Sequence, residues 1–439
     1  MNTHTNLIVN GKVWMDGEFQ NMDITIRDGS IHGFHSPDER PAAQAETVLD
    51  AKGCYVLPGG IDMHAHIQDG AETFFEGSLA ALRGGITTVV DMPPFKSITT
   101  ISQLNKRVEQ ADSQCVSDLA FTGGILLDES DLTHLEEVFH AGVTQFKIFM
   151  LSKPTDDFLW EAIQRSAQVG FRLTIHMEEP SLLSAVDWDD PLGFPKANPP
   201  SAENAAVARL LEMAHAAGAA VHVCHVSSAR SAELIAKHKA WGTAVTAETT
   251  PHYLILNEEI FSVCPERAIV TPAIRTKRDN DLLWQALEEG VLDTLVSDHF
   301  LGALPDPSRP RPKPKDAEPG IAGLELSLPL IYDQGVCKGK LSMQRFIEAA
   351  SQTPARLLHI QHKKGKIQAG MDADLVLFDP LKKWKVQDMG EQSRISTLPY
   401  ENWELQGSVR ATLVRGKVCW DDEKSLPEKG WGTFVPGNN

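Results

Sequence analysis

Two histidines with one residue between them, His64 and His66, follow an apolar run and a Pro-Gly-Gly turn in the segment LPGGIDMHAHIQDG at 57–70. Residues i and i+2 of a β-strand point to the same face, so the two imidazoles would leave the end of a strand side by side. Such a pair can hold a metal ion through two nitrogens. A pair of hydrogen-bonded histidines on a half-buried strand explains this pair equally well, so the assignment depends on the rest of the chain.

Four further polar residues stand near the ends of apolar, strand-like runs: Lys147 in QFKIFM, His176 in LTIHMEE, His225 in HVCHVSS and Asp298 in SDH. Zinc favours imidazole nitrogen and carboxylate oxygen as ligands, and a catalytic zinc site leaves one position open for water. Four histidines and one aspartate exceed what one such ion needs. The residues therefore predict two divalent ions, with Zn2+ expected.

Each of these residues also has a purely structural interpretation. Taken singly, His176 or His225 would more often be a packed core histidine, and Asp298 could cap the segment that follows it. Lys147 is harder to explain in this way, because a lysine is rarely buried without a partner and its apolar strand offers none. A buried amine is more easily deprotonated and becomes available for chemistry. The occurrence of all these residues at successive strand ends favours the metal site.

The middle of the chain, 58–360, alternates apolar strand candidates with amphipathic helical windows such as 156–170. This alternation is typical of βα units and a parallel sheet. The eight strand candidates span 60–66, 86–92, 118–126, 142–150, 171–177, 219–226, 244–250 and 293–299. Eight strands with crossover helices predict an α/β fold, a (β/α)8 TIM barrel, in which catalytic residues stand at the carboxyl ends of the strands.

The two ends of the chain differ from this middle. Residues 1–57 alternate short β-type runs with turns, and 361–439 resume this style in DADLVLFDP and SVRATLVRGKVCWDD. The pattern predicts one small sheet domain made from both termini. Two long interruptions, 251–290 and the Pro-rich 302–320, are typical of lids or substrate loops, although the Pro and Lys run of the second also suits a stiff, solvated excursion.

The composition, with 42% hydrophobic and 23% charged residues among 439, is that of an ordinary soluble globular protein. A formal charge of −18 argues against nucleic acid and anionic membranes as partners, because phosphate binding needs a basic surface. The N-terminus lacks a basic segment followed by a long apolar core, and no apolar run approaches the roughly 18 residues of a membrane span. We expect a cytoplasmic location.

Six cysteines without CxxC spacing are expected to be free thiols.

Eight segments together resemble a known group of enzymes. In chain order they are PGGIDMHAH, GGITTVVDMP, FKIFM, HVCHVSSARS, TPHYL, SDH, PGIAGLE and ADLVLFDP. Their order and spacing resemble the cyclic amidohydrolases of the amidohydrolase superfamily, the group of allantoinases, dihydroorotases and hydantoinases or dihydropyrimidinases. The resemblance covers almost the whole chain. It implies a small cyclic amide as substrate, a β-sandwich built from both termini, and a homo-oligomer, either a tetramer or a dimer.

The resemblance also implies how the metal site is built. In this group two ions are bridged by a lysine that carbon dioxide has carboxylated. Carried over to this chain, His64 and His66 bind one ion with Asp298, His176 and His225 bind the other, and modified Lys147 bridges them. An ammonium cannot bind a cation, whereas a carbamate offers one anionic oxygen to each ion. A water molecule activated by the ions would open the ring, with Asp298 as the catalytic residue that accepts its proton and returns it to the leaving nitrogen.

The substrate is predicted from positions at which this chain differs from some members of this group. Dihydroorotases resemble one another in an Arg and an Asn where this chain has Gln68 and Pro94, so a substrate carboxylate would lose its guanidinium partner here. Hydantoinases and dihydropyrimidinases tend to carry a tyrosine just past the lysine, where this chain has Ser152. Allantoinases resemble this chain better in CHVSS, PGIAGLE and 401–418, although they usually carry Asn near DMP. Allantoin is therefore expected first, with the other cyclic amides as alternatives.

Four residues are expected to contact the substrate: Gln68, Thr271, His299 and Gly323. Thr271 stands where relatives offer a small polar side chain to the ring, although it also suits a turn before Pro272. Arg275, Lys313 and Lys315 are cations in segments that could reach the mouth of the barrel and hold a carboxylate instead.

Two rival functions remain open at this stage. A mononuclear deaminase on the same barrel would use His-x-His, a third His and an Asp but no bridging lysine, so it would bind one ion instead of two. A non-catalytic relative would have lost metal ligands, whereas all six are present in this chain.

Overall fold

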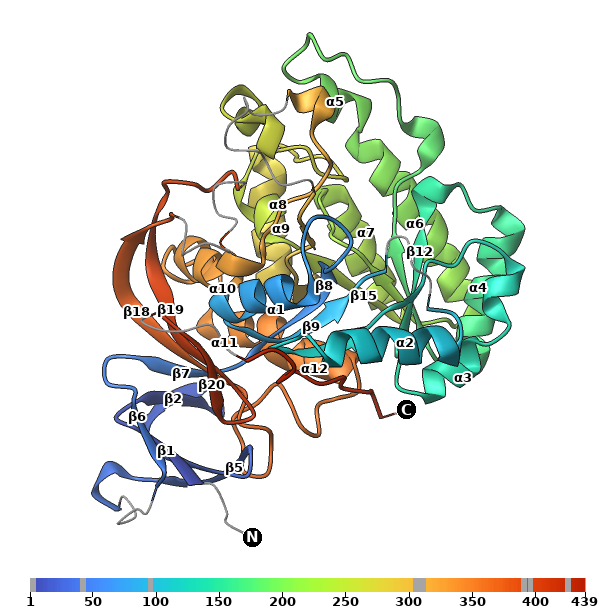
Figure 1. The fold of residues 1–439 in the computed structure, drawn as a ribbon. Coiled ribbons are helices and arrows are strands. Elements are labelled where there is room, and N and C mark those ends of the chain that lie inside the picture. The colour runs from blue at the N-terminus through green and yellow to red at the C-terminus, as the bar shows by residue number, and fades with distance from the viewer. Residues whose placement is uncertain are drawn as a thin grey trace.

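A closed ring of parallel strands forms the centre of the molecule, with helices around it (Figure 1). The computed structural model describes residues 5–39, 45–93, 98–302, 313–387, 393, 398–422 and 428–438. The strands of the ring are β8 (Gly60–His66), β9 (Ile86–Asp91), β10 (Asp118–Phe121), β11 (Gly123–Gly124), β12 (Gln145–Phe149), β13 (Arg172–His176), β14 (Val221–Val223), β15 (Val245–Thr249), β16 (Thr294–Leu295) and β17 (His299–Phe300). They form two hydrogen-bonded runs, β10-β9-β8-β17 and β11-β12-β13-β14-β15-β16. Because β10 leads into β11 and β16 leads into β17, the two runs close into one barrel.

Each of the eight predicted strand positions holds a strand, so the predicted TIM barrel is confirmed. The third position is divided into β10 and β11, and the eighth into β16 and β17. All six residues of β9 are buried, as expected for a parallel strand with helices outside and packed side chains inside. This burial on both faces is why the barrel strands are apolar runs without a polar alternation.

The helices lie between successive strands and cover the outside of the barrel. They are α1 (Phe74–Arg83), α2 (Ile101–Asp112), α3 (Leu135–His140), α4 (Asp156–Val169), α5 (Gly193–Ala197), α6 (Pro200–Ala217), α7 (Ala229–Ala240), α8 (Pro251–Ile255), α9 (Lys277–Glu288), α10 (Ser327–Ile331), α11 (Met343–Ile347) and α12 (Thr353–Leu357). Thr73 begins α1 with a capping box, in which its side chain accepts the N–H of Glu76 while the Glu76 carboxylate accepts the N–H of Thr73. Gly170 ends α4 at a φ of +97°, which glycine adopts without strain. Among the helices of the described residues, none is long and apolar enough to cross a membrane.

Two smaller sheets pack beside the barrel, at the lower left of Figure 1. One has the order β5-β4-β1-β6, and the other has the order β20-β19-β18-β7-β2-β3. Their strands are β1 (Thr5–Val9), β2 (Lys12–Met15), β3 (Glu18–Asn21), β4 (Asp23–Arg27), β5 (Ser30–His35), β6 (Thr47–Asp50), β7 (Tyr55–Pro58), β18 (Leu375–Lys385), β19 (Glu404–Val414) and β20 (Lys417–Asp421).

The second sheet is built from both ends of the chain. β7 pairs antiparallel with β18, so that Pro58 lies opposite Leu375. Ile8 and Ile24 of the first sheet share a buried apolar cluster with Leu375 of the second. This arrangement confirms the predicted composite β-sandwich. The exact domain limits of 1–57, 58–360 and 361–439 stay a prediction.

The sandwich is joined to the barrel by a very short link. β7 ends at Pro58 and β8 begins at Gly60, leaving only Gly59 between them. A Cβ atom at Gly59 would lie 2.1 Å from the Thr87 hydroxyl of β9, so only glycine fits there. The start of β8, the strand that carries the two histidines, is therefore fixed by the link to β7 and by its close packing against β9.

The end of the chain returns from the sandwich to the barrel. The Leu119 N–H of β10 donates to the Thr433 carbonyl at 3.0 Å, and the Val435 N–H donates to the Leu119 carbonyl at 2.7 Å. Phe434 packs near Phe121, with 5.5 Å between ring centroids. The sequence pattern places this tail with the sheet domain, whereas the structure places it against β10.

A buried ion-pair cluster lies where the sandwich, the barrel and this tail meet. Lys364 Nζ donates to Asp118 of β10 at 2.7 Å and to Asp374 at 2.5 Å. Arg415, between β19 and β20, also pairs with Asp118, and its N–H donates to Asp374 at 2.8 Å. The Thr433 N–H donates to the same Asp118 carboxylate at 3.0 Å. One carboxylate of the barrel thus contacts three later segments of the chain.

Candidate metal centre and active site

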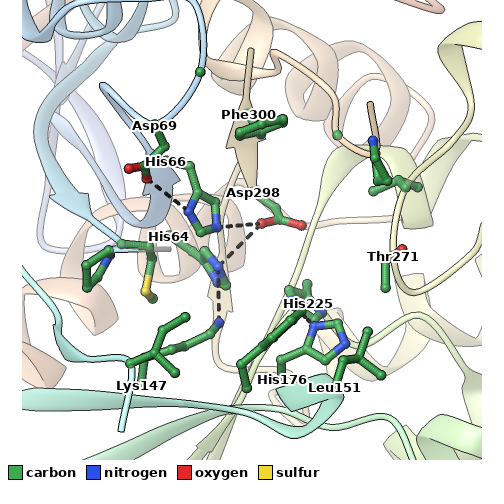
Figure 2. Close-up of a pocket in the computed structure, with 18 of the residues that line it drawn as sticks. His64, His66, Asp69, Lys147, Leu151, His176, His225, Thr271, Asp298 and Phe300 are labelled. Carbon is green, nitrogen blue, oxygen red and sulfur yellow. Dashed lines mark hydrogen bonds and ion pairs between the residues drawn. The ribbon is translucent and has the colours of Figure 1, made fainter. Parts of the chain in front are cut away.

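The six predicted metal ligands come together at the carboxyl ends of the barrel strands. They are His64 and His66 at the end of β8, Lys147 in β12, His176 at the end of β13, His225 after β14 and Asp298 before β17. All six line one cavity of about 1200 Å³. Figure 2 shows the first two histidines, the lysine and the aspartate pointing toward one another, with the other two histidines beside them.

One half of this site gathers around Asp298. The Oδ1 atom of Asp298 lies 3.3 Å from His64 Nε2 and 3.8 Å from His66 Nε2. Each of these three residues offers one ligand atom, and the three atoms lie within 4.8 Å of one another. They are close enough to share one ion. Lys147 Nζ lies 3.4 Å from the same His64 Nε2, so the lysine borders this half of the site.

The other half is formed by His176 and His225. Their facing nitrogens, Nδ1 of His176 and Nε2 of His225, are 3.0 Å apart. The rings of His64 and His225 have centroids 5.3 Å apart, so the two halves are neighbours. Lys147 comes from β12, beside the β13 strand that carries His176. The lysine therefore stands at the border between the halves, where a bridging group would have to be.

Two of these residues have an unusual backbone. His225 has a φ of +32° and Asp298 has a φ of +47°, in the left-handed region that residues other than glycine rarely adopt. Both residues follow the last paired positions of a barrel strand. Such backbone strain is typical of functional sites, where the surrounding structure holds a side chain in a required direction.

Buried carboxylates hold the imidazoles from behind. Glu248 on β15 accepts a hydrogen bond from His64 Nδ1 and contacts His222 Nε2 at 3.0 Å. Glu178 lies 2.9 Å from His176 Nε2. A carboxylate on one ring nitrogen fixes the tautomer and leaves the other nitrogen as the ligand. The contacts thus direct His64 Nε2 and His176 Nδ1 into the cavity.

Sequence reasoning missed both carboxylates and the thiol of Cys224, which lies 3.2 Å from Lys147 Nζ. Two signals could have found the carboxylates. Glu178 stands two residues after His176, and Glu248 is a charged residue inside the apolar strand candidate AVTAETT. A carboxylate in such a strand needs polar partners when it is buried.

Burial keeps two of the histidines in the neutral form that binds metal. Burial, together with the neighbouring His64, lowers the pKa of His66 to about 3. Burial and then His176 hold the pKa of His225 well below its usual value. Metal ligation requires a deprotonated nitrogen, so both rings are ready to bind an ion near pH 7.

His64 lies in a different electrostatic environment. Burial and the Lys147 ammonium lower its pKa, but the carboxylates of Glu248 and Asp298 outweigh them and raise it to about 10. These two carboxylates therefore stabilise positive charge at His64. An ion bound at Nε2 would be stabilised by the same two groups.

The donor set fits two divalent ions. Imidazole nitrogens and a carboxylate are ligands that zinc prefers, and all of them are directed into one cavity. Lys147 is only 4% exposed and faces His64 Nε2 and the Cys224 thiol. As an ammonium it has no lone pair to offer an ion, whereas a carbamate at the same Nζ would offer two anionic oxygens.

The expected substrate contacts are only partly placed in the cavity. Thr271 lines it, whereas Gln68, His299 and Gly323 are not among its described lining residues. The Gln68 side chain accepts a hydrogen bond from Arg107 at 3.3 Å. Pro94 lies outside the described residues.

His299 and Gly323 lie behind the site. His299 Nε2 pairs with Glu72 at 2.5 Å, and its Nδ1 accepts the N–H of Leu324 at 3.3 Å. Gly323 stands next to Ser297, whose carbonyl would lie 3.4 Å from a Cβ at that glycine. Both residues therefore support the strand end that carries Asp298.

The expected alternative cations also lie elsewhere. Arg275 is buried, and it donates to Ser227 Oγ at 3.0 Å and to the Asn198 carbonyl at 2.5 Å. Lys313 and Lys315 are exposed and are not among the described residues that line the cavity.

The wall of the cavity beyond the ligands is mostly apolar. Its apolar residues include Ile125, Leu127, Phe149, Leu151, Val270 and Phe300. The charged residues that join the six ligands in the described lining are Asp69 and Glu318, both acidic. Apart from histidine, Lys147 is the single basic residue in that lining. Beyond the six predicted ligands, a substrate carboxylate would therefore meet no cationic side chain of the described wall.

Comparison with known proteins extends this picture over the whole chain. The model of the amidohydrolase family matches residues 55–419. An allantoinase of Streptomyces avermitilis is 35% identical over 429 residues, which cover 93% of each chain. An L-hydantoinase of Paenarthrobacter aurescens is 31% identical over 440 residues, 95% of this chain and 94% of the relative. The crystal structure of a dihydropyrimidinase from Brevibacillus agri has a TM-score of 0.89 at 28% identity and covers 99% of both chains.

These similarities span both the barrel and the sandwich. The names of these relatives describe enzymes that act on cyclic amides. The fold, the ligand arrangement and the family match agree with one another. The chain therefore belongs to the amidohydrolase family, among its cyclic amidohydrolases.

Proposed function

We propose that this enzyme hydrolyses the ring amide bond of a neutral cyclic ureide or imide, and that allantoin, opened to allantoate, is its preferred substrate. The observation that carries the proposal is the convergence of four imidazoles, Lys147 and Asp298 in one cavity. The full-length similarity to an allantoinase at 35% identity supports the choice of substrate.

The metal centre is assigned to these same residues. His64, His66 and Asp298 would hold one divalent ion, and His176 and His225 the other, with Zn2+ as the expected metal. Lys147 would be carboxylated by carbon dioxide, with an N–C bond formed at Nζ and the displaced N–H proton released, and the carbamate would supply oxygen ligands to both ions. When bound, the ions would polarise the substrate carbonyl and lower the pKa of a water molecule.

Asp298 is the catalytic residue in this proposal. Its Oδ1 is 3.3 Å from His64 Nε2 and 3.8 Å from His66 Nε2, so it borders the place where water and substrate would meet. The carboxylate accepts the proton of the attacking water and returns it to the ring nitrogen as the amide C–N bond breaks. Leu151 and Phe300 contribute apolar surface to the wall of the same cavity.

A second candidate is favoured by the same apolar wall. Leu127, Phe149 and Leu151 line the cavity and would suit a hydantoin or dihydropyrimidine ring with an apolar substituent. The similarity to a hydantoinase and a dihydropyrimidinase supports this alternative. Dihydroorotate is disfavoured because its carboxylate finds no cation in the described wall.

A substrate panel tests the proposal. Metal-replete enzyme is assayed with allantoin, a 5-substituted hydantoin, dihydrouracil and dihydroorotate, and kcat/KM is compared. The proposal expects ring opening with allantoin fastest. A faster reaction with the hydantoin favours the second candidate, and no reaction with any of the four refutes the assignment. Assembly as a tetramer or dimer and a cytoplasmic location stay predictions, checked by light scattering and by cell fractionation.

A further inference from the structure

The side chain of Glu248 contacts both halves of the candidate metal centre. It lies on β15, away from the cavity lining, and its side chain is fully buried. Its Oε1 atom accepts hydrogen bonds from His64 Nδ1 and from the backbone N–H of His225, the latter at 3.2 Å. These two histidines belong to different halves of the site.

The contact with His64 determines which ring nitrogen faces the cavity. With Nδ1–H donated to Glu248, loss of the second ring proton leaves the lone pair of His64 on Nε2, which lies 3.3 Å from Asp298 Oδ1. A carboxylate partner also makes the imidazole a stronger ligand. Glu248 thus sets the tautomer, the orientation and the basicity of His64.

The contact with His225 holds a strained backbone. His225 has a φ of +32°, which costs free energy unless its surroundings hold it. Glu248 contacts this segment twice, because its side chain accepts the His225 N–H and its own carbonyl accepts the Val226 N–H at 2.8 Å. The direction of the His225 side chain into the cavity therefore depends on where Glu248 lies.

The carboxylate itself is held in place by a further residue. His222 Nε2 contacts Glu248 Oε2 at 3.0 Å, and His222 Nδ1 contacts Thr246 Oγ1 at 2.7 Å. Both carboxylate oxygens are therefore in use. By contrast, Glu178 contacts the imidazole of His176 alone among the candidate ligands.

We propose that Glu248 is a positioning residue that couples the two halves of the metal centre, because one carboxylate oxygen fixes the tautomer of His64 and the backbone of His225 together. The inference rests on the proposed function, since it needs both histidines to be metal ligands. It requires that a change at Glu248 weakens the binding of both ions, although Glu248 is not among the six residues proposed to ligate them.

The test compares Glu248→Gln and Glu248→Asp with wild type and with Asp118→Asn. Glutamine removes the charge at nearly constant shape, and aspartate keeps the charge but shortens its reach. Asp118→Asn is the matched control, because it also neutralises a buried carboxylate on a barrel strand. The partners of this carboxylate are Lys364 and Arg415, which are not candidate metal ligands. Zn2+ affinity is measured by competition with a chromophoric chelator, and Co2+-loaded protein is compared by its visible absorption.

We expect both Glu248 variants to bind each of the two ions about 10- to 100-fold more weakly and to show an altered Co2+ spectrum. Asp118→Asn should lower the melting temperature but leave affinity and spectrum unchanged. Loss of only one ion, or wild-type affinity for both in either folded variant, overturns the inference.

Failure of the proposed function would look different. In that case wild type itself would bind fewer than two ions, and Lys147→Ala would bind metal as wild type does. If wild type binds two ions, Lys147→Ala loses them and the Glu248 variants keep them, the proposed function stands and the role of Glu248 is refuted. Circular dichroism of each apoprotein establishes that the variants compared are folded.

Discussion

The absence of a cationic side chain from the described cavity wall leads to a prediction about substrate charge. Dihydrouracil and dihydroorotate share a six-membered ring and differ by one carboxylate. A hydrogen bond to a charged group contributes about 1.5 to 3 kcal/mol. Beyond the six predicted ligands, the described wall offers dihydroorotate no cationic side chain for such a bond. The described wall adds only the acidic Asp69 and Glu318 to the six ligands. We therefore expect kcat/KM for dihydrouracil to exceed that for dihydroorotate by roughly tenfold to a hundredfold.

Ring opening of both compounds is followed by the loss of ultraviolet absorption on one Zn2+-loaded preparation, with product confirmed by mass spectrometry. Leu151 offers a matched pair of variants, because it lines the cavity and is half-buried (Figure 2). Leu151→Arg supplies a guanidinium and should reduce the ratio of the two kcat/KM values, whereas Leu151→Gln adds polarity without charge and should not. A wild-type enzyme that prefers dihydroorotate, or a ratio that changes equally in both variants, would refute the electrostatic reasoning.

Three further predictions concern single residues. Lys147→Ala should retain fewer than two ions by elemental analysis and lose activity, with partial recovery in short carboxylic acids that replace the carbamate; normal metal content and turnover would contradict the bridging role. Asp298→Asn should lower kcat by about 10²- to 10⁴-fold, the usual contribution of a general acid or base, and a rate near wild type on the metal-loaded variant would remove Asp298 from the mechanism. Burial raises the pKa of Asp118, but Lys364 and Arg415 outweigh it and hold that pKa below its usual value. The stabilisation from this carboxylate is therefore present above about pH 4 and is lost as the pH falls further, so Asp118→Asn should flatten the decline of urea midpoints below about pH 4.

The barrel could be predicted from the sequence because its strands are short apolar runs at regular intervals. β9, for example, is buried on both faces and reads as the uninterrupted run ITTVVD. The division of the eighth strand could not be predicted, since it depends on the left-handed backbone of Asp298. The return of the tail to β10 could not be predicted either. The contact between Phe434 and Phe121 joins two segments far apart in the sequence, and no local sequence pattern connects them.

The candidate ligands could be predicted for a related reason. In a barrel the carboxyl ends of all strands meet, so polar residues such as His176 and Asp298 had to converge once the strands were placed. Orientation could not be predicted in the same way. Gln68 stands two residues after His66 and His299 directly follows Asp298, but their side chains contact Arg107 and Glu72. Adjacency along a strand end does not fix the direction of a side chain when the backbone turns there.

The docking of the tail on β10 joins two segments that a ribosome makes far apart in time. Thr433 contacts Asp118 across 315 residues of sequence. At about 5 to 20 residues per second, a ribosome needs roughly 15 to 60 seconds to make that stretch. The Asp118 carboxylate of the nascent chain lacks Lys364 for the first 246 residues of this stretch and Arg415 for the first 297. The contacts that join β10 to the later segments therefore form late in synthesis, and chains that end before Thr433 lack the last of them and should unfold at a lower temperature than the full chain.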